Sequence, residues 1–250
     1  IQIFTAYMKS FKDNKLNSIT KSDSLEDKNN EYISIKEANP EESLESLLKE
    51  LNCLIGLETV KNDVNSLINL IQIRKIREKR GISQPDMSLH LVFSGNPGTG
   101  KTTVARLLAK IYFKIGVLSK GHLVEVDRSG LVGGYVGQTA LKVKDVVAKA
   151  MGGILFVDEA YTLAPINSTG ERDQQGAQAL EKLMKRMEDN RGDFVVVLAG
   201  YRIEMDNLFR VNPGFRSRFN YFLNIDDYNP DELLQIINVF ASEKKYVFST

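Results

Sequence analysis

A glycine-rich stretch follows the apolar run Leu91–Ser94 and matches the pattern G-x-x-x-x-G-K-[ST] at every defined position. It reads Gly95, Asn96, Pro97, Gly98, Thr99, Gly100, Lys101, Thr102. Glycines let such a loop aim its backbone N–H groups at phosphate oxygens, and a helix expected over residues 103–113 adds the positive end of its dipole. The spacing predicts a loop for the phosphates of a nucleoside triphosphate, with Lys101 at the β- and γ-phosphates and Thr102 as a Mg²⁺ ligand. A glycine-rich turn without a ligand is the alternative, and the strand, loop and helix context argues against it.

Two acidic residues, Asp158 and Glu159, end the apolar run Ile154–Val157. Ligands bind at the carboxyl edge of sheets with parallel strands, so both carboxylates are expected beside the phosphate loop. We assign Asp158 to the Mg²⁺ shell, through water, and Glu159 to orienting and polarising the water that attacks the γ-phosphate. A capped strand end without chemistry is the alternative for the pair alone. Together with the loop, the pair predicts hydrolysis of the triphosphate, because water is then the favoured acceptor.

Short apolar runs alternate with helical patterns along the chain. The runs lie at residues 91–94, 122–126, 154–157, 195–199 and, more weakly, 219–225. The third and fourth runs are apolar throughout, which indicates strands covered on both faces. The sequence therefore predicts an α/β fold with a mostly parallel five-stranded sheet flanked by helices.

Three segments differ in composition. Residues 1–42 are read as a polar linker or tail, because few apolar side chains are present to offset the entropy of ordering. Residues 43–227 hold the α/β subdomain, which opens with a short amphipathic helix after Ser43 and a longer helix that ends at Gly81. Residues 228–250 contain a final helix from Pro230, whose apolar stripe has little of this chain to pack against. Because the chain begins with Ile1 and not with Met, we read it as a piece of a longer protein.

The charge balance is nearly neutral, since 33 basic and 32 acidic side chains leave a net charge of +1. Such a chain is not held to nucleic acid by bulk charge. The single cysteine, Cys53, permits no internal disulfide and fits a reducing, cytoplasmic compartment. The longest aliphatic runs are too short to span a bilayer, so we expect no membrane partner. His90 and His122 each precede an apolar run and are read as strand-start residues, not as catalytic ones.

Several stretches taken together resemble the AAA+ ATPases, which are P-loop NTPases, and within them the branch of stage V sporulation protein K and the red-type, CbbX-like Rubisco activases. The stretches are residues 54–56, 95–103, 120–123, 152–161 and 212–219. The resemblance covers about Ser43 to Thr250 and implies an AAA+ fold in which residues 228–250 are the first part of a small, truncated helical lid. It also implies self-association into a ring, usually a hexamer, with ATP and Mg²⁺ between neighbouring subunits. The ATP contacts carried over are Ile55, Gly56, Pro97, Gly98, Thr99, Gly100, Lys101, Thr102 and Thr103.

The same resemblance places an arginine from one subunit at the ATP site of the next, where it stabilises charge on the transferred phosphoryl group. By the family pattern this residue is Arg218, and Arg216 is the less favoured candidate. Both arginines could instead form ion pairs within their own subunit. We therefore take the catalytic set to be Glu159, Lys101 and Arg218.

The stretch Tyr135, Val136, Gly137 lies among glycines and resembles the first pore loop of AAA+ threading machines. In that loop an aromatic side chain grips a peptide segment of a protein client. A tyrosine packed against its own subunit is the alternative. Tyr201 falls where the family usually has a polar sensor of the γ-phosphate, often Asn or Thr, and it is left out of the catalytic set.

These observations predict an ATP-hydrolysing AAA+ ring that remodels or threads a protein client through a central pore with its Tyr135 loop. Two alternatives share the same nucleotide chemistry: a motor that acts on nucleic acid, and an assembly module that binds ATP with little hydrolysis. Near-neutral charge disfavours the first. The residues fix neither the client nor the ring size.

Overall fold

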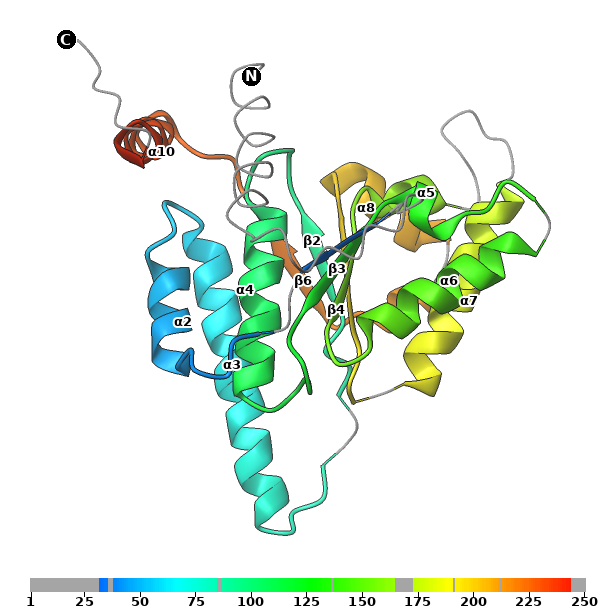
Figure 1. Ribbon diagram of the computed structural model, residues 1–250, viewed down its shortest axis with the longest axis horizontal. Helices are drawn as coiled ribbons and strands as arrows, with labels where there is room; N and C mark the ends of the chain where they lie inside the picture. The colour runs from blue at the N-terminus through cyan, green and yellow to red at the C-terminus, as the bar shows by residue number, and fades with distance from the viewer. Residues whose placement is uncertain are drawn as a thin grey trace, which may run out of the picture.

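The computed structural model describes residues 32–35, 38–84, 87–135, 137–164, 173–190, 192–211 and 213–243. Within these ranges the strands form one six-stranded sheet in the order β1-β3-β4-β5-β2-β6 (Figure 1). The strands are β1 Tyr32–Ile35, β2 Leu91–Ser94, β3 Leu123–Val126, β4 Ile154–Val157, β5 Val195–Gly200 and β6 Tyr221–Asn224. Strands β2 to β6 are paired in parallel. The predicted α/β fold with a parallel five-stranded sheet is therefore confirmed.

Strand β1 is an addition to that prediction. It pairs antiparallel with β3, with Tyr32 opposite Val126 and Ile35 opposite Leu123. It lies inside residues 1–42, which the sequence analysis assigns to a linker, so the boundary at residue 42 separates β1 from the sheet with which it pairs. Four residues with single apolar side chains do not stand out from their polar surroundings, and an edge strand needs backbone pairing on one side only.

Helices cover both faces of the sheet (Figure 1). Helices α2, α3 and α4 lie on one face, and α6, α7 and α8 lie on the other. The helices are α2 Leu44–Asn52, α3 Glu58–Lys79, α4 Lys101–Lys114, α5 Arg128–Leu131, α6 Gln138–Ala150, the 3₁₀ helix η1 Ala160–Leu163, α7 Gln174–Asp189, α8 Arg202–Val211, α9 Pro213–Arg216 and α10 Pro230–Glu243. Among the described residues, no helix is both long and apolar enough to cross a bilayer.

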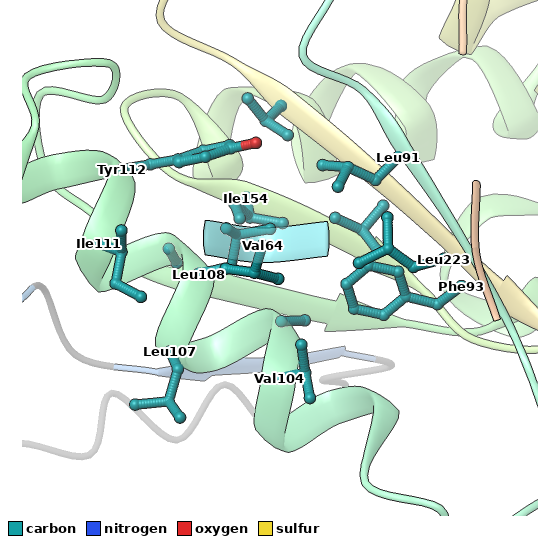
Figure 2. Close-up of a cluster of buried hydrophobic side chains, with 14 of the residues drawn as sticks. Val64, Leu91, Phe93, Val104, Leu107, Leu108, Ile111, Tyr112, Ile154 and Leu223 are labelled. Carbon is teal, nitrogen blue, oxygen red and sulfur yellow. The ribbon is translucent and has the colours of Figure 1, made fainter. Parts of the chain in front are cut away.

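Alternate side chains of each central strand enter two separate cores. Leu91 and Phe93 of β2 belong to the core under α2, α3 and α4, while Val92 between them belongs to the core under α6, α7 and α8. Figure 2 shows the first core, in which Leu108 and Tyr112 of α4 belong to the same buried cluster as Phe93 of β2. Burial of one such large side chain contributes about 1.5–3 kcal/mol. The two cores hold the carboxyl ends of the strands in fixed positions, and the site is built on those ends.

The last described helix, α10, is capped at its start and exposed along its apolar side. The Asn229 side chain accepts from the Glu232 N–H at 2.9 Å, and the Glu232 carboxylate accepts from the Asn229 N–H at 2.8 Å. Leu233 and Ile237, two residues of the predicted apolar stripe, are 37% and 45% exposed. This exposure agrees with the expectation that the apolar stripe finds little to pack against in this chain.

Candidate active site

The glycine-rich loop leaves the sheet between two neighbouring strands. The Gly95 N–H donates to the Gly200 carbonyl of β5 at 3.1 Å, and a Cβ added at Gly95 would lie 2.3 Å from the Ile225 carbonyl oxygen. Gly98 and Gly100 have left-handed backbones, with φ of 81° and 95°, which glycine adopts without steric cost. The backbone conformation and the close packing of this loop therefore require glycine at these three positions. Helix α4 begins at Lys101, two residues before its predicted start, because the loop runs directly into it.

The Lys101 ammonium group lies against the backbone of this loop. Its Nζ donates to the carbonyls of Gly95 at 2.9 Å and Asn96 at 2.6 Å. Burial lowers the pKa of Lys101, while the charges of Asp158, Asp227 and Glu159 act in the opposite direction. The loop thus carries a half-buried cation that faces several carboxylates.

The segment between β6 and α10 forms hydrogen bonds with the same glycine-rich loop. The Asn96 side chain donates to both Asp227 carboxylate oxygens, at 2.7 and 3.0 Å, and the Tyr228 hydroxyl donates to the Thr99 carbonyl at 3.2 Å. Thr99 is buried, and its hydroxyl donates to the Asn96 carbonyl at 2.8 Å. Sequence reasoning did not find Asp227 and Tyr228, since no local pattern links them to a loop so far away along the chain.

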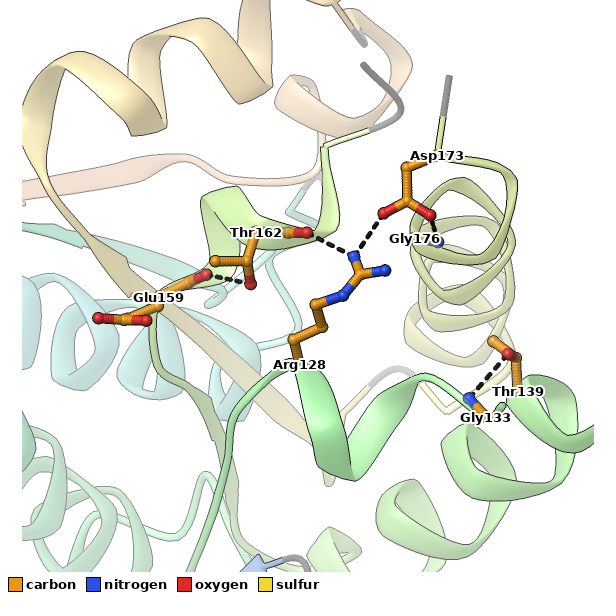
Figure 3. Close-up of polar contacts among 7 residues, drawn as sticks. All are labelled: Arg128, Gly133, Thr139, Glu159, Thr162, Asp173 and Gly176. Carbon is orange, nitrogen blue, oxygen red and sulfur yellow. Dashed lines mark hydrogen bonds and ion pairs between the residues drawn. The ribbon is translucent and has the colours of Figure 1, made fainter. Parts of the chain in front are cut away.

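The two acids leave β4 through a sharp turn. The Asp158 N–H donates to the Val126 carbonyl at 2.8 Å, which extends the pairing of β3 and β4 by one residue. Glu159 has a left-handed backbone with φ of 48°, a conformation that is uncommon for a residue with a Cβ. Its carbonyl accepts from the Thr162 hydroxyl at 2.7 Å (Figure 3). This turn leaves the Glu159 carboxylate exposed at the cleft.

An open cleft of about 160 Å³ brings the loop and the acids together. It is lined by Gly95, Pro97, Gly98, Gly100, Lys101, Thr102, Thr103, Asp158, Glu159, Tyr161, Gly200 and Tyr201. The residues predicted from spacing to bind phosphate, hold Mg²⁺ and activate water therefore share one cleft. The glycine cradle, the Thr102 hydroxyl and the Asp158 carboxylate fit a triphosphate and a hard cation.

Two tyrosines also line the cleft. The ring centroids of Tyr161 and Tyr201 are 5.6 Å apart. Burial, followed by the charge of the nearby Glu159 carboxylate, raises the pKa of Tyr161 to about 12. The Tyr161 hydroxyl consequently stays protonated near neutral pH and remains a hydrogen-bond donor. Tyr201 is outside the predicted catalytic set, and Tyr161 was not predicted as a site residue.

The predicted adenine contacts, Ile55 and Gly56, are not among the residues that line this cleft. Gly56 lies at the joint between α2 and α3, where an added Cβ would be 2.8 Å from the Glu232 carboxylate of α10. Gly56 and the following Leu57 both have left-handed backbones, with φ of 64° and 62°. The structure therefore places this joint beside the start of α10.

The two candidate arginines differ in their surroundings. Arg218 forms an ion pair with Glu188 and donates to the Gly214 carbonyl, and it does not line the cleft of its own chain. Arg216 lies on Phe222, with its Cζ 4.1 Å from the ring centroid. The intramolecular ion pair considered as an alternative is thus present for Arg218, and Arg216 makes a cation–π contact.

The predicted pore loop is anchored at its ends and exposed at its aromatic residue. Tyr135 is 75% exposed. The Gly133 N–H donates to the hydroxyl of buried Thr139 at 3.0 Å, and Gly137 has a left-handed backbone with φ of 87°. Val136 lies outside the described residues. The Tyr135 side chain is therefore mostly open to solvent, and its role as a client contact stays a prediction.

A family model described as ATPase family associated with various cellular activities (AAA) matches residues 91–227. The chain belongs to this family. Stage V sporulation protein K of Bacillus subtilis is 43% identical to this AAA ATPase over 82% of the chain, which spans 63% of the relative's length. The chloroplastic ribulose bisphosphate carboxylase/oxygenase activase of Cyanidioschyzon merolae is 44% identical over 84% of the chain and 70% of the relative. Protein CbxX of Cupriavidus necator is 46% identical over 86% and 67%. The predicted branch of the family is confirmed.

A solved structure supports the fold of the AAA ATPase. A chain of the Escherichia coli MS115-1 HORMA, CdnC and Trip13 complex superposes with a TM-score of 0.55 at 16% identity, covering 84% of this chain and 74% of the other. At that identity the likeness concerns the fold alone.

Replacing the Glu159 carboxylate by an amide tests the role of the cleft in hydrolysis. Glu159→Gln keeps the shape of the side chain but removes its ability to accept a proton from water, so phosphate release should fall by about 10²-fold or more. ATP affinity, measured by calorimetry, should stay close to that of the parent protein. Glu181→Gln, an exposed change on α7, is the control and should leave phosphate release unchanged. Hydrolysis by Glu159→Gln at the parent rate would contradict the assignment.

Proposed function

We propose that the protein is an ATP-hydrolysing AAA+ ring, of six subunits by family pattern, that remodels a protein client with its Tyr135 loops. The observation that carries the proposal is the cleft shared by Lys101, Thr102, Asp158 and Glu159. The exposed Tyr135 supports it, because its loop follows β3, which is the neighbour of the strand β4 that precedes the two acids. A cleft of this kind catalyses the hydrolysis of ATP. The exposed tyrosine offers a contact through which the energy released can act on the client.

The residues of the cleft divide the work of hydrolysis. The backbone of the loop and Lys101 would hold the β- and γ-phosphates, and Thr102 and Asp158 would hold Mg²⁺. When bound, the cation neutralises charge on the phosphoryl oxygens. Glu159 orients one water molecule in line with the γ-phosphate and accepts its proton.

An arginine from a second subunit completes this arrangement in the proposed ring. Arg218 does not line the cleft of its own chain, which agrees with a role in the neighbouring subunit. Its side chain is 27% exposed and that of Glu188 is 46% exposed, and a surface pair of this kind contributes only about 0–1 kcal/mol. A contact with a phosphoryl group in the transition state is worth several times more, so the pair does not prevent Arg218 from acting across an interface.

The Tyr135 loop is the proposed contact with the client. Apart from the chain neighbours, no atom of the described residues would lie within 4 Å of a Cβ added at Gly134 or at Gly137, so this part of the loop is open. An exposed aromatic side chain offers a large apolar surface for contact with a peptide segment of the client. Near-neutral charge argues against a nucleic acid as the client. The Cyanidioschyzon relative is named as an activase of the enzyme ribulose bisphosphate carboxylase/oxygenase, and activating an enzyme is an action on a protein.

Truncating Arg218 tests whether this residue acts at the ATP site of the neighbouring subunit. Arg218→Ala should reduce turnover by about 10³-fold or more while ATP affinity is kept, because the guanidinium acts on the transition state. Glu188→Gln breaks the same ion pair but keeps Arg218 available, and its turnover should match the parent. Phosphate release by both variants, at concentrations where the ring is assembled, separates the two roles. Parent-like turnover in Arg218→Ala would reject the assignment.

Truncating Tyr135 tests the client contact. In a Glu159→Gln background, where ATP is held, affinity isolation from the cells that make the protein should recover a protein client. Adding Tyr135→Ala should abolish that recovery. Tyr135→Phe should preserve it, because the aromatic side chain makes the apolar contact with the client. Tyr135→Ala alone should keep ATP hydrolysis within about twofold of the parent. Recovery of nucleic acid in place of protein would contradict the proposal.

A further inference from the structure

The guanidinium group of Arg128 joins two parts of the chain that the proposed function uses separately. Arg128 is the first residue of α5, two positions after β3. Its Nη1 donates to the Thr162 carbonyl at 2.6 Å and to the Asp173 carboxylate at 2.5 Å. Figure 3 shows the guanidinium between η1 and the start of α7. One side chain therefore contacts the turn that follows β4 and the helix beyond it.

Thr162, which accepts from Arg128, is itself hydrogen-bonded to Glu159. The Thr162 hydroxyl and N–H donate to the Glu159 carbonyl at 2.7 and 2.9 Å. Glu159 is one of two residues with a Cβ whose φ is positive in the described ranges. A left-handed backbone at such a residue is strained and persists only when neighbouring contacts hold it. The Arg128 contact with η1 is one of those that fix the turn and so the direction of the Glu159 carboxylate.

The backbone of α5 also connects Arg128 to the Tyr135 loop. Asp127 caps α5, accepting from the Ser129 N–H at 2.8 Å, and the Arg128 carbonyl accepts from the Val132 N–H at 2.9 Å. Gly133 follows and is tied to Thr139 of α6. A Cβ added at Gly133 would lie 2.3 Å from the Gln138 Cβ, so the base of the loop is tightly packed. Helix α5 is therefore joined to the base of the loop by a short segment whose contacts hold it in place.

Asp173 keeps the guanidinium in place. It caps α7, accepting from the Gly176 N–H at 2.9 Å. Burial alone would raise the pKa of Asp173, but its hydrogen bonds to Arg128 and to Gly176 bring the pKa below the ordinary value. The carboxylate is thus ionised at neutral pH and pairs with Arg128. A Cβ added at Gly176 would lie 2.6 Å from Asp173 Oδ2 and 3.1 Å from Arg128 Nη1, so the glycine leaves the room that this pair needs.

We infer that Arg128 is a positioning residue that couples the turn bearing Glu159 to the loop bearing Tyr135. Nucleotide-dependent changes at Glu159 then reach Tyr135 through Thr162, the guanidinium and α5, and contacts made by Tyr135 return along the same path. The inference rests on the proposed function, because it joins the catalytic and client-binding parts of that function.

Steady-state kinetics of the intact protein test the positioning role. Arg128→Gln should lower kcat on the order of tenfold and leave KM for ATP within about twofold, since a carboxylate that is slightly misplaced slows chemistry more than binding. Arg128→Lys keeps a cationic donor and should restore part of kcat. Gly176→Ala keeps every charge but crowds the pair, and it should also lower kcat.

The matched control breaks a different ion pair of similar exposure. Lys110 and Glu42 are 2.9 Å apart, with side chains 28% and 30% exposed, compared with 36% and 19% for Arg128 and Asp173. Lys110→Gln should leave kcat unchanged. An unchanged kcat in Arg128→Gln would overturn the inference. So would a loss of kcat that comes with a raised KM and a lowered melting temperature and that Arg128→Lys does not relieve.

A fluorescent reporter tests the coupling itself. The chain contains no tryptophan, so Tyr135→Trp gives a single indole on the loop. In a Glu159→Gln background, adding ATP and Mg²⁺ should shift its emission, and adding Arg128→Gln should abolish the shift while calorimetry still detects ATP binding. A shift of equal size without Arg128, or no shift with Arg128 present, would overturn the coupling. Failure of the proposed function would show differently, as normal hydrolysis by Glu159→Gln in the kinetic assay.

Discussion

The half-buried ammonium group of Lys101 imposes the constraint on which the surrounding structure depends. Removing a cation from water is costly unless oxygen atoms replace the water. Here the carbonyls of Gly95 and Asn96 accept from Nζ, and the carboxylates of Asp158, Asp227 and Glu159 act against the lowering of its pKa by burial. Bound phosphate oxygens would satisfy the same ammonium group more strongly. The glycines of the loop, the acids after β4 and the segment after β6 therefore all lie around this one charge.

Parallel strands make the arrangement possible, because their carboxyl ends meet at one edge of the sheet. The phosphate loop follows β2, Arg128 and the Tyr135 loop follow β3, and the two acids follow β4. Strands β3 and β4 are direct neighbours, whereas β5 lies between β4 and β2. The neighbourhood of β3 and β4 explains how a side chain near the end of β3 reaches the turn after β4.

The parts of the fold and site that could be predicted are those encoded by local spacing. The phosphate loop, the acids after β4 and the parallel strands each have a pattern within a few residues, and the structure confirms the strands and brings the loop and the acids together. Contacts between distant segments have no such pattern, as with Asn96 and Asp227 or Arg128 and Asp173. Strand β1 was missed because backbone pairing, which leaves little trace in composition, holds it to β3. The roles of Arg218 and Tyr135 were inferred from family resemblance and stay predictions, since they concern a neighbouring subunit and a client.

Calorimetric titration with ATP and Mg²⁺ tests the central claim most directly, comparing the parent protein with Lys101→Ala and with Lys110→Ala on the same helix. The account predicts that Lys101→Ala weakens binding on the order of 100-fold, the equivalent of about 2.7 kcal/mol, while Lys110→Ala binds as the parent does. A titration of Lys101→Ala that matches the parent would contradict the account, because the triphosphate would then not lie against this loop.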